Sequence, residues 1–125
     1  MADVVNQNIL NEFIVEELSL NQNWFQEQFN NFLDQVQDFQ GFSWQEASMN
    51  INELQQLCFN LRLGCRQFGA LLLDQQLAEL EAVLQHGQNF HIQSMYEITV
   101  STSIETLELI NEYAQEIFNE NSRAG

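Results

Sequence analysis

Residues 51–68 read INELQQLCFNLRLGCRQF, and this stretch decides the fold class. When residues are placed about 100° apart around a helix axis, its apolar side chains fall within about sixty degrees of one direction. They are Ile51, Leu54, Leu57, Cys58, Leu61, Cys65 and Phe68. The spacing predicts an amphipathic helix with this stripe in a core, and Ser48 or Asn50 as its N-cap.

The segments before this stretch show the same helical spacing. Residues 4–18 form one pattern, with Val5, Ile9, Phe13 and Ile14 on its apolar side. A stronger pattern follows and ends near Gly41; its apolar members are Trp24, Phe25, Phe29, Phe32, Leu33, Val36 and Phe39. We expect a helix from each pattern and a loop over residues 41–48.

The segments after it are helical as well. Leu71 or Leu73 begins a pattern that Leu77, Leu80 and Leu84 continue, and His86-Gly87 is its expected stop. A last helix, in one piece or two, is predicted from Ile92, Met95, Tyr96, Ile104, Leu107, Ile110, Ala114, Ile117 and Phe118. The β-branched and hydroxyl residues 99–103 favour a kink or break there. We expect the polar tail from about residue 119 to fray.

Composition agrees with an all-α fold. The chain has 125 residues, 45% of them hydrophobic with ten Phe and two Trp, which is enough for one domain with a real core. It has no Pro and only five Gly, too few for the turns of a β-sandwich or the loops of an α/β fold. We predict a single domain over residues 1–125, an antiparallel four-helix bundle with an additional short helix. The residues expected to be buried are Phe29, Phe32, Leu54, Leu57, Leu61, Leu77, Leu80 and Leu107.

The charge restricts the partners. The net charge is −15, the chain has no Lys, and its only Arg residues are Arg62, Arg66 and Arg123. Such a field opposes direct binding to nucleic acid or to an anionic bilayer, and the apolar runs are far shorter than the ~20 residues of a membrane span. The acidity either attracts a basic partner or only keeps the chain in solution. The N-terminus does not resemble a secretory signal and two cysteines make no disulfide framework, so we expect a cytoplasmic protein.

Residues that could support catalysis are few. His86 and His91 are five positions apart with Gly87 between them, which supplies neither helical pair geometry nor a third metal ligand. Cys58 and Cys65 lie on the apolar stripe, where a thiol packs as a small apolar group. The carboxylates form no calcium loop. We therefore predict no catalytic residue, no metal site and no cofactor.

One group of residues points away from the core. Measured from Leu54, the side chains of Arg62, Arg66, Phe59 and Leu63 lie at about 80, 120, 140 and 180 degrees. Two arginines of a strongly acidic chain thus share an outward face with a Phe and a Leu. This face is either a second packing contact, with the arginines paired to nearby Glu, or a surface that binds a partner.

The run from Phe59 to Ala70, FNLRLGCRQFGA, resembles the histidine phosphotransfer (HPt) domains of two-component phosphorelays. Their pattern is His, any residue, an apolar residue, Lys, Gly, Ser, Ser and, some three residues later, an apolar-Gly-Ala turn before a leucine-rich helix. Alignment on Gly69-Ala70 puts Arg62 at the lysine and Phe59 at the phosphoacceptor histidine. Leu63 replaces the glycine, and Gly64-Cys65 replaces the hydroxyl pair. In the alternative register, with Gly64 on the glycine, the acceptor position is Asn60; neither register supplies a histidine.

HPt domains accept a phosphoryl group from a receiver aspartate onto an exposed histidine in the middle of a bundle helix. Members without that histidine bind receivers or kinases without relaying phosphate. The resemblance therefore implies a non-catalytic module that docks a receiver domain or a histidine kinase. Its partner surface would comprise Phe59, Arg62, Leu63 and Arg66 together with apolar residues of the first helix.

Two other functions remain open. The chain could be an acidic helical adaptor or inhibitor of a basic partner, unrelated to phosphorelays, for which the charge is the support. It could also be a working HPt protein with His86 or His91 as acceptor, although both residues lie outside the central helix.

Overall fold

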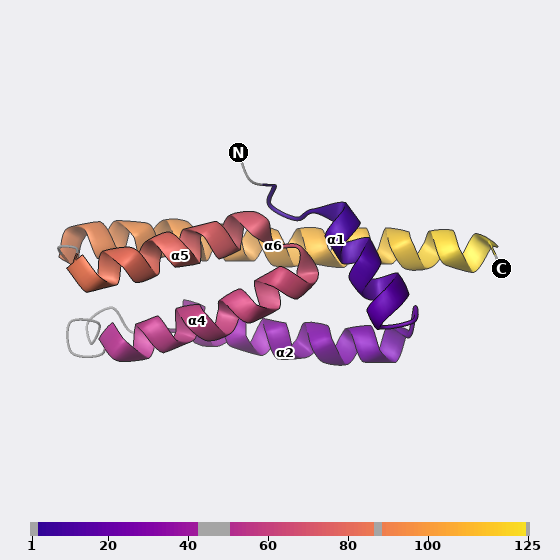
Figure 1. The fold of residues 1–125 in the computed structure, drawn as a ribbon, viewed down its shortest axis with the longest axis horizontal. Coiled ribbons are helices and arrows are strands. Elements are labelled where there is room, and N and C mark those ends of the chain that lie inside the picture. The colour runs from indigo at the N-terminus through magenta and orange to yellow at the C-terminus, as the bar shows by residue number, and fades with distance from the viewer. Residues whose placement is uncertain (1–2, 43–50, 87–88, 125) are drawn as a thin grey trace.

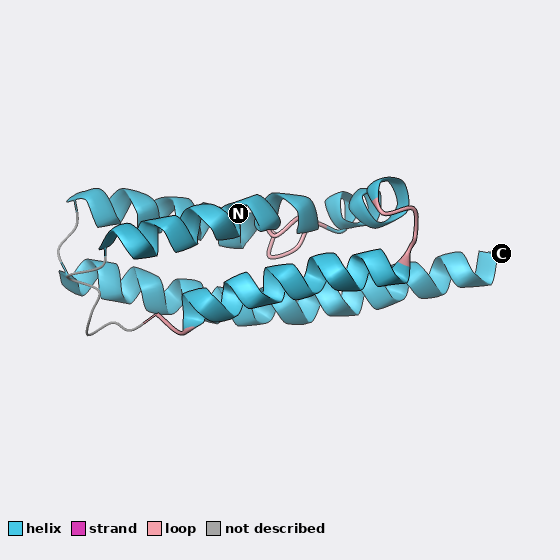
Figure 2. Ribbon diagram, turned by 90° about the horizontal axis from the view of Figure 1, so that it is seen from below, coloured by secondary structure: helices cyan, strands magenta, loops and turns pink. Residues whose placement is uncertain are grey.

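The computed structural model describes residues 3–42, 51–86 and 89–124, and over these ranges the chain is helical with no strand (Figures 1 and 2). The elements are α1 (Gln7–Glu12), the π-helical turn η1 (Phe13–Glu17), α2 (Gln22–Gln40), α4 (Ile51–Phe68), α5 (Leu71–His86) and α6 (Asn89–Ala124). The all-helical prediction is confirmed for this part of the chain. None of these helices is both long enough and apolar enough to cross a membrane.

The four longest helices form an antiparallel bundle. Helix α4 packs between α2 and α5, and α6 packs between α5 and α2, so α6 lies diagonally across the bundle from α4. Helix α1 crosses one end, where it contacts α4 and α6. The C-terminal turns of α6 extend past the ends of the other helices (Figures 1 and 2).

Aromatic rings fill the core at the end covered by α1. Phe68 is buried there, and its ring centroid lies 5.0 to 6.3 Å from those of Phe13, Phe25, Phe29 and Phe32. Of the eight residues predicted to be buried, six are, namely Phe29, Phe32, Leu54, Leu61, Leu77 and Leu80. Leu57 and Leu107 are half-buried at the margins of their stripes. Leu73, not Leu71, is the buried member of the pair at the start of α5.

The first helix is joined to the turn between α4 and α5. Asn6 caps α1, since its Oδ1 accepts the N–H of Ile9 at 3.0 Å, and its own N–H donates to the carbonyl of Gly69 at 2.8 Å. Gly69 has φ +73°, and a Cβ on it would lie 2.7 Å from the Asn6 carbonyl oxygen. Glycine is required here both for the left-handed backbone and for this close approach. The helix begins at Gln7, three residues later than its pattern suggests.

The expected break in the last helix is wrong, because α6 is continuous from Asn89 to Ala124. Within it Thr99, Thr102, Ser103 and Thr106 are buried. The hydroxyls of Thr99 and Thr106 donate to the carbonyls four residues earlier at 2.7 Å, and that of Ser103 donates to Val100 at 2.6 Å. Burial of these satisfied hydroxyls against the bundle outweighs their low helix propensity. The tail after Phe118 also continues the helix instead of fraying.

Two apolar residues that fit the helical patterns are exposed. Trp24 has 51% of its surface exposed and Ile104 has 50%. Gly41 ends α2 as predicted. The rest of the predicted 41–48 loop from residue 43 on, the Ser48 or Asn50 cap and Gly87 lie outside the described residues.

Candidate protein-binding face on α4

The outer side of α4 carries an exposed apolar pair. Phe59 is 56% exposed and Leu63, one turn later, is 53% exposed, whereas Leu54 and Leu61 on the same helix are fully buried. Arg66 is exposed on the following turn. The angular separation read from the sequence thus holds for these three outward residues.

The fourth residue of the predicted face, Arg62, is not an open surface cation. Its Nε donates to Asp74 Oδ1 at 2.9 Å and its Nη1 to Glu81 Oε2 at 3.0 Å, and all three side chains are only 24% exposed. The hydrogen bond that Arg62 donates to Asp74 raises the pKa of Arg62, so the guanidinium stays charged. At about 80° from the core direction, Arg62 faces the neighbouring helix α5 more than solvent. For Arg62, this pairing agrees with the first of the two alternatives, in which the arginines pair with nearby carboxylates at a packing contact.

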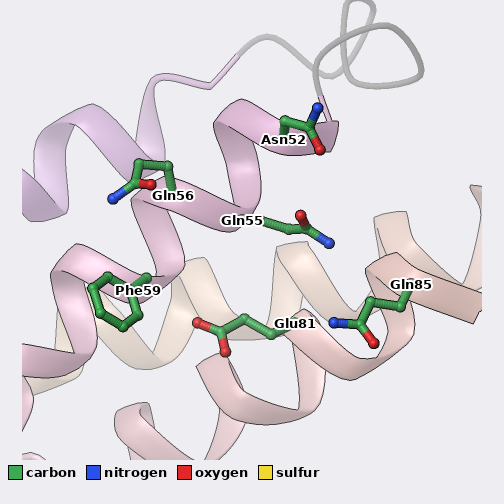
Figure 3. Close-up of a pocket in the computed structure, with 6 residues that line it drawn as sticks. All are labelled: Asn52, Gln55, Gln56, Phe59, Glu81 and Gln85. Carbon is green, nitrogen blue, oxygen red and sulfur yellow. The ribbon is translucent and has the colours of Figure 1, made fainter.

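A pocket of about 400 Å³ lies between α4 and α5, directly beside Phe59 (Figure 3). It is lined by Asn52, Gln55, Gln56, Phe59, Glu81 and Gln85. Figure 3 shows Glu81 extending from α5 with its carboxylate toward the Phe59 ring. The sequence patterns gave no reason to single out Glu81, because its role depends on which residues of α4 lie opposite.

On the other side of α4, Leu63 borders a groove between α2 and α4. Several amide side chains line it, and its volume is about 260 Å³. The lining residues are Gln28, Asn31, Phe32, Gln35, Asn60, Leu63, Gly64, Gln67 and Phe68. Trp24 lies one helical turn before Gln28, and positions 24, 28, 31 and 35 share one face of α2. Trp24, which its pattern assigned to the apolar side of the helix, therefore adds an exposed aromatic residue to this side of the molecule.

The first helix does not add apolar residues to this face. Leu10, Phe13 and Ile14 are buried in the core, and Ile9 and Val15 are partly buried. The expected contribution of the first helix to a docking patch is therefore wrong. Its apolar side is used to close the end of the bundle against α4 and α6.

The residues with potential reactivity lie elsewhere or are buried. Burial raises the pKa of Cys58 to about 12, with a further contribution from the charge of Glu81, and burial likewise raises the pKa of Cys65. Both thiols are therefore protonated near neutral pH. His86 at the end of α5 and His91 near the start of α6 are exposed. Among the described residues, no three His, Cys, Asp or Glu side chains are placed to hold a metal ion.

Taken together, α4 presents Phe59 and Leu63 between two amide-lined hollows, an arrangement suited to contact with another protein. No family model, curated protein or solved structure matches the chain.

Proposed function

We propose that the chain is a non-catalytic, HPt-like module that docks a receiver domain or a histidine kinase of a two-component phosphorelay without relaying phosphate. The observation that supports this most directly is the position of Phe59. In the register set by Gly69-Ala70 it takes the place of the phosphoacceptor histidine, which the alternative register gives to Asn60; it lies in the middle of a helix of an antiparallel bundle and is 56% exposed. A large apolar side chain at a position where the family displays its reactive group favours binding over transfer.

In this proposal Phe59 and Leu63 are the apolar anchors. When a partner removes these exposed apolar side chains from water, the complex is stabilised by roughly 25 cal/mol per Å² of apolar surface. The amides of the two flanking hollows offer hydrogen bonds to the partner's backbone, and Arg66 supplies a cation at the rim. Arg62, whose charge is engaged by Asp74 and Glu81, is assigned to holding α4 against α5 and not to direct contact.

The first test replaces Phe59 with alanine. We expect Phe59→Ala to weaken binding to a receiver domain by ~1–4 kcal/mol while leaving the free energy of unfolding within ~0.5 kcal/mol, because an exposed anchor contributes little to the fold. Calorimetric titration and urea unfolding measure the two quantities. Ile104→Ala is the matched control, since Ile104 is 50% exposed on the diagonally placed α6 and should affect neither. A Phe59→Ala protein that is strongly destabilised but binds normally would place the residue in the core and the docking face elsewhere.

The second test asks whether the chain carries phosphate. Incubated with a phosphorylated receiver, or with a kinase and ATP, it should acquire no acid-labile label, because the acceptor position holds no histidine in either register. A functional HPt domain run in parallel is the positive control. Label that disappears in His86→Gln or His91→Gln would instead make the chain a working phosphotransfer protein.

One observation favours the second candidate function, an acidic adaptor or inhibitor of a basic partner. Helix α6 exposes Glu97, Glu105, Glu108, Glu112 and Glu116, and the chain has no Lys to pair with them. A partner held by this helix would bind much more weakly as salt rises, and Phe59→Ala would leave its binding unchanged. The same variant therefore distinguishes the two functions.

A further inference from the structure

The pocket between α4 and α5 is lined by Glu81, which belongs to a charged group with one excess negative charge. Arg62 is the single cation set against the two carboxylates of Asp74 and Glu81, and it pairs with Oε2 of Glu81. The other oxygen, Oε1, is buried and has no hydrogen-bond donor. A buried carboxylate oxygen without a donor destabilises the fold, and the negative charge makes this cost larger than for a neutral oxygen. The three side chains of Arg62, Asp74 and Glu81 therefore lack one hydrogen-bond donor, and one of their two negative charges has no cation to balance it.

The remaining walls of the pocket suit a flat cation. The exposed ring of Phe59 lies on the side toward which Glu81 extends (Figure 3), and the face of an aromatic ring attracts cations. The other lining side chains are neutral amides, whose carbonyl oxygens accept hydrogen bonds. One of them, Gln56, donates its Nε2 to Asn60 Oδ1 at 3.0 Å, which directs its NH₂ group along α4. No Lys or Arg is among the described lining residues.

We propose that this pocket binds an arginine side chain of the partner protein, with the guanidinium stacked on Phe59 and donating to Glu81. A guanidinium is planar and carries five donors in a fixed plane, so it can stack on a ring while bonding to a carboxylate and to amide carbonyls at its edge. An ammonium is a compact, strongly hydrated charge and satisfies this combination less well. A carboxylate offers about four lone-pair sites, and Arg62 occupies one of those of Glu81, so the carboxylate can accept further donors.

The surroundings support a cationic ligand. The whole chain carries a net charge of −15, which draws positively charged groups toward it. The triad itself retains one uncompensated negative charge beside the most exposed aromatic residue of α4. That the arginine belongs to a partner protein rests on the proposed function. The chemistry of the pocket can be tested without any partner.

The experiment titrates the isotope-labelled full chain with N-acetyl-arginine methylamide and follows backbone amide signals by NMR. The neutral isostere N-acetyl-citrulline methylamide is the matched ligand control. We expect saturable shifts of Phe59, Glu81 and Gln85 with the arginine compound and at least about tenfold weaker binding of the citrulline compound, because it lacks the charge.

Three variants connect the signal to the pocket. Glu81→Gln should weaken arginine binding about tenfold and Phe59→Ala about fivefold, whereas Glu79→Gln, which removes the same charge from an exposed position on the same helix, should change it less than about twofold. Glu81→Gln also removes an ion pair, so unfolding curves accompany each variant. Phe59→Ala breaks no ion pair and keeps the test decisive if Glu81→Gln unfolds.

Four results would overturn the inference: equal binding of citrulline, shifts spread along the acidic side of α6, no effect of Phe59→Ala, or tighter binding of the corresponding lysine compound. Receiver binding without any arginine binding would overturn this inference and leave the proposed function standing. Arginine binding in the pocket with no binding to receivers or kinases would overturn the proposed function and leave this inference standing.

Discussion

Gly64 sets how closely α2 approaches the centre of α4. A Cβ placed on it would lie 2.5 Å from Cδ1 and 2.9 Å from Cε1 of Phe32, a ring that is almost fully buried. Glycine inside a helix costs about 1 kcal/mol relative to alanine. The chain accepts this cost because the ring of Phe32 occupies the space of the missing side chain. The same contact forms the floor of the groove beside Leu63.

Gly64→Ala should therefore destabilise the protein by ~1–3 kcal/mol, although helix propensity alone favours alanine. The added methyl group must displace either the Phe32 ring or α2 itself, and neither is free to move in a packed core. Urea unfolding measures the change. A second change, Phe32→Leu, should recover part of the loss in the double variant. An increase in stability for Gly64→Ala alone would show that the helices can separate here without cost.

Helix α6 depends on its neighbours for its continuity. Ser103 Oγ donates to the Val100 carbonyl at 2.6 Å and accepts the Nε2 of Gln40 at 3.0 Å, so one hydroxyl links α6 to α2. Near it, the Tyr96 hydroxyl donates to the carbonyls of Phe39 and Gln40 at the end of α2. These bonds satisfy polar groups at the interface and fix the alignment of the two helices.

Two variants, Ser101→Ala and Ser103→Ala, separate the effect of helix propensity from that of packing in α6. Ser101 is exposed, so Ser101→Ala should be neutral or slightly stabilising, as expected for a solvent-facing helix position. Ser103→Ala should destabilise by ~0.5–1.5 kcal/mol, because it leaves the Gln40 amide without its acceptor. Thermal unfolding monitored by circular dichroism measures both. Equal effects of the two changes would mean that the link to α2 contributes nothing to stability.

For the molecule as a whole, charge repulsion opposes the compact state. The net charge is −15, and the ion pairs among the described residues are the two made by Arg62. Exposed carboxylates gather on α6 without cations between them. Folding brings these charges closer together than they are in the unfolded chain, which costs free energy at low ionic strength.

Added salt should therefore raise the stability. The screening length falls from about 30 Å at 0.01 M to about 10 Å at 0.1 M salt, a range that covers the spacing of charges across a small bundle. We expect the urea midpoint to rise over this interval, since the half-buried pairs of Arg62 are screened less than the surface repulsion. An uncharged osmolyte at equal osmolality is the control. A midpoint that falls with salt would mean that attractive ion pairs outweigh the repulsion.

Local periodicity was enough to determine the fold class and part of the candidate site. The positions of Leu54, Leu61 and Phe68 on one side of α4, and of Phe59 and Leu63 on the other, follow from helix geometry alone. This works because the angle between two side chains of one helix is fixed by the backbone. The composition, which includes no proline and few glycines, favoured helices over folds that need many turns.

Only the tertiary structure decided which neighbour each side chain meets. The angular position of Arg62 on its helix followed from the sequence. Its ion pairs with Asp74 and Glu81 form only because α5 lies alongside α4. Likewise, Trp24 and Ile104 match apolar patterns and are exposed, whereas the hydroxyl residues of α6 are buried and helical. A sequence specifies the direction of a side chain on its own helix, but burial, pairing and pockets arise between helices, whose relative placement is set by packing across the whole core.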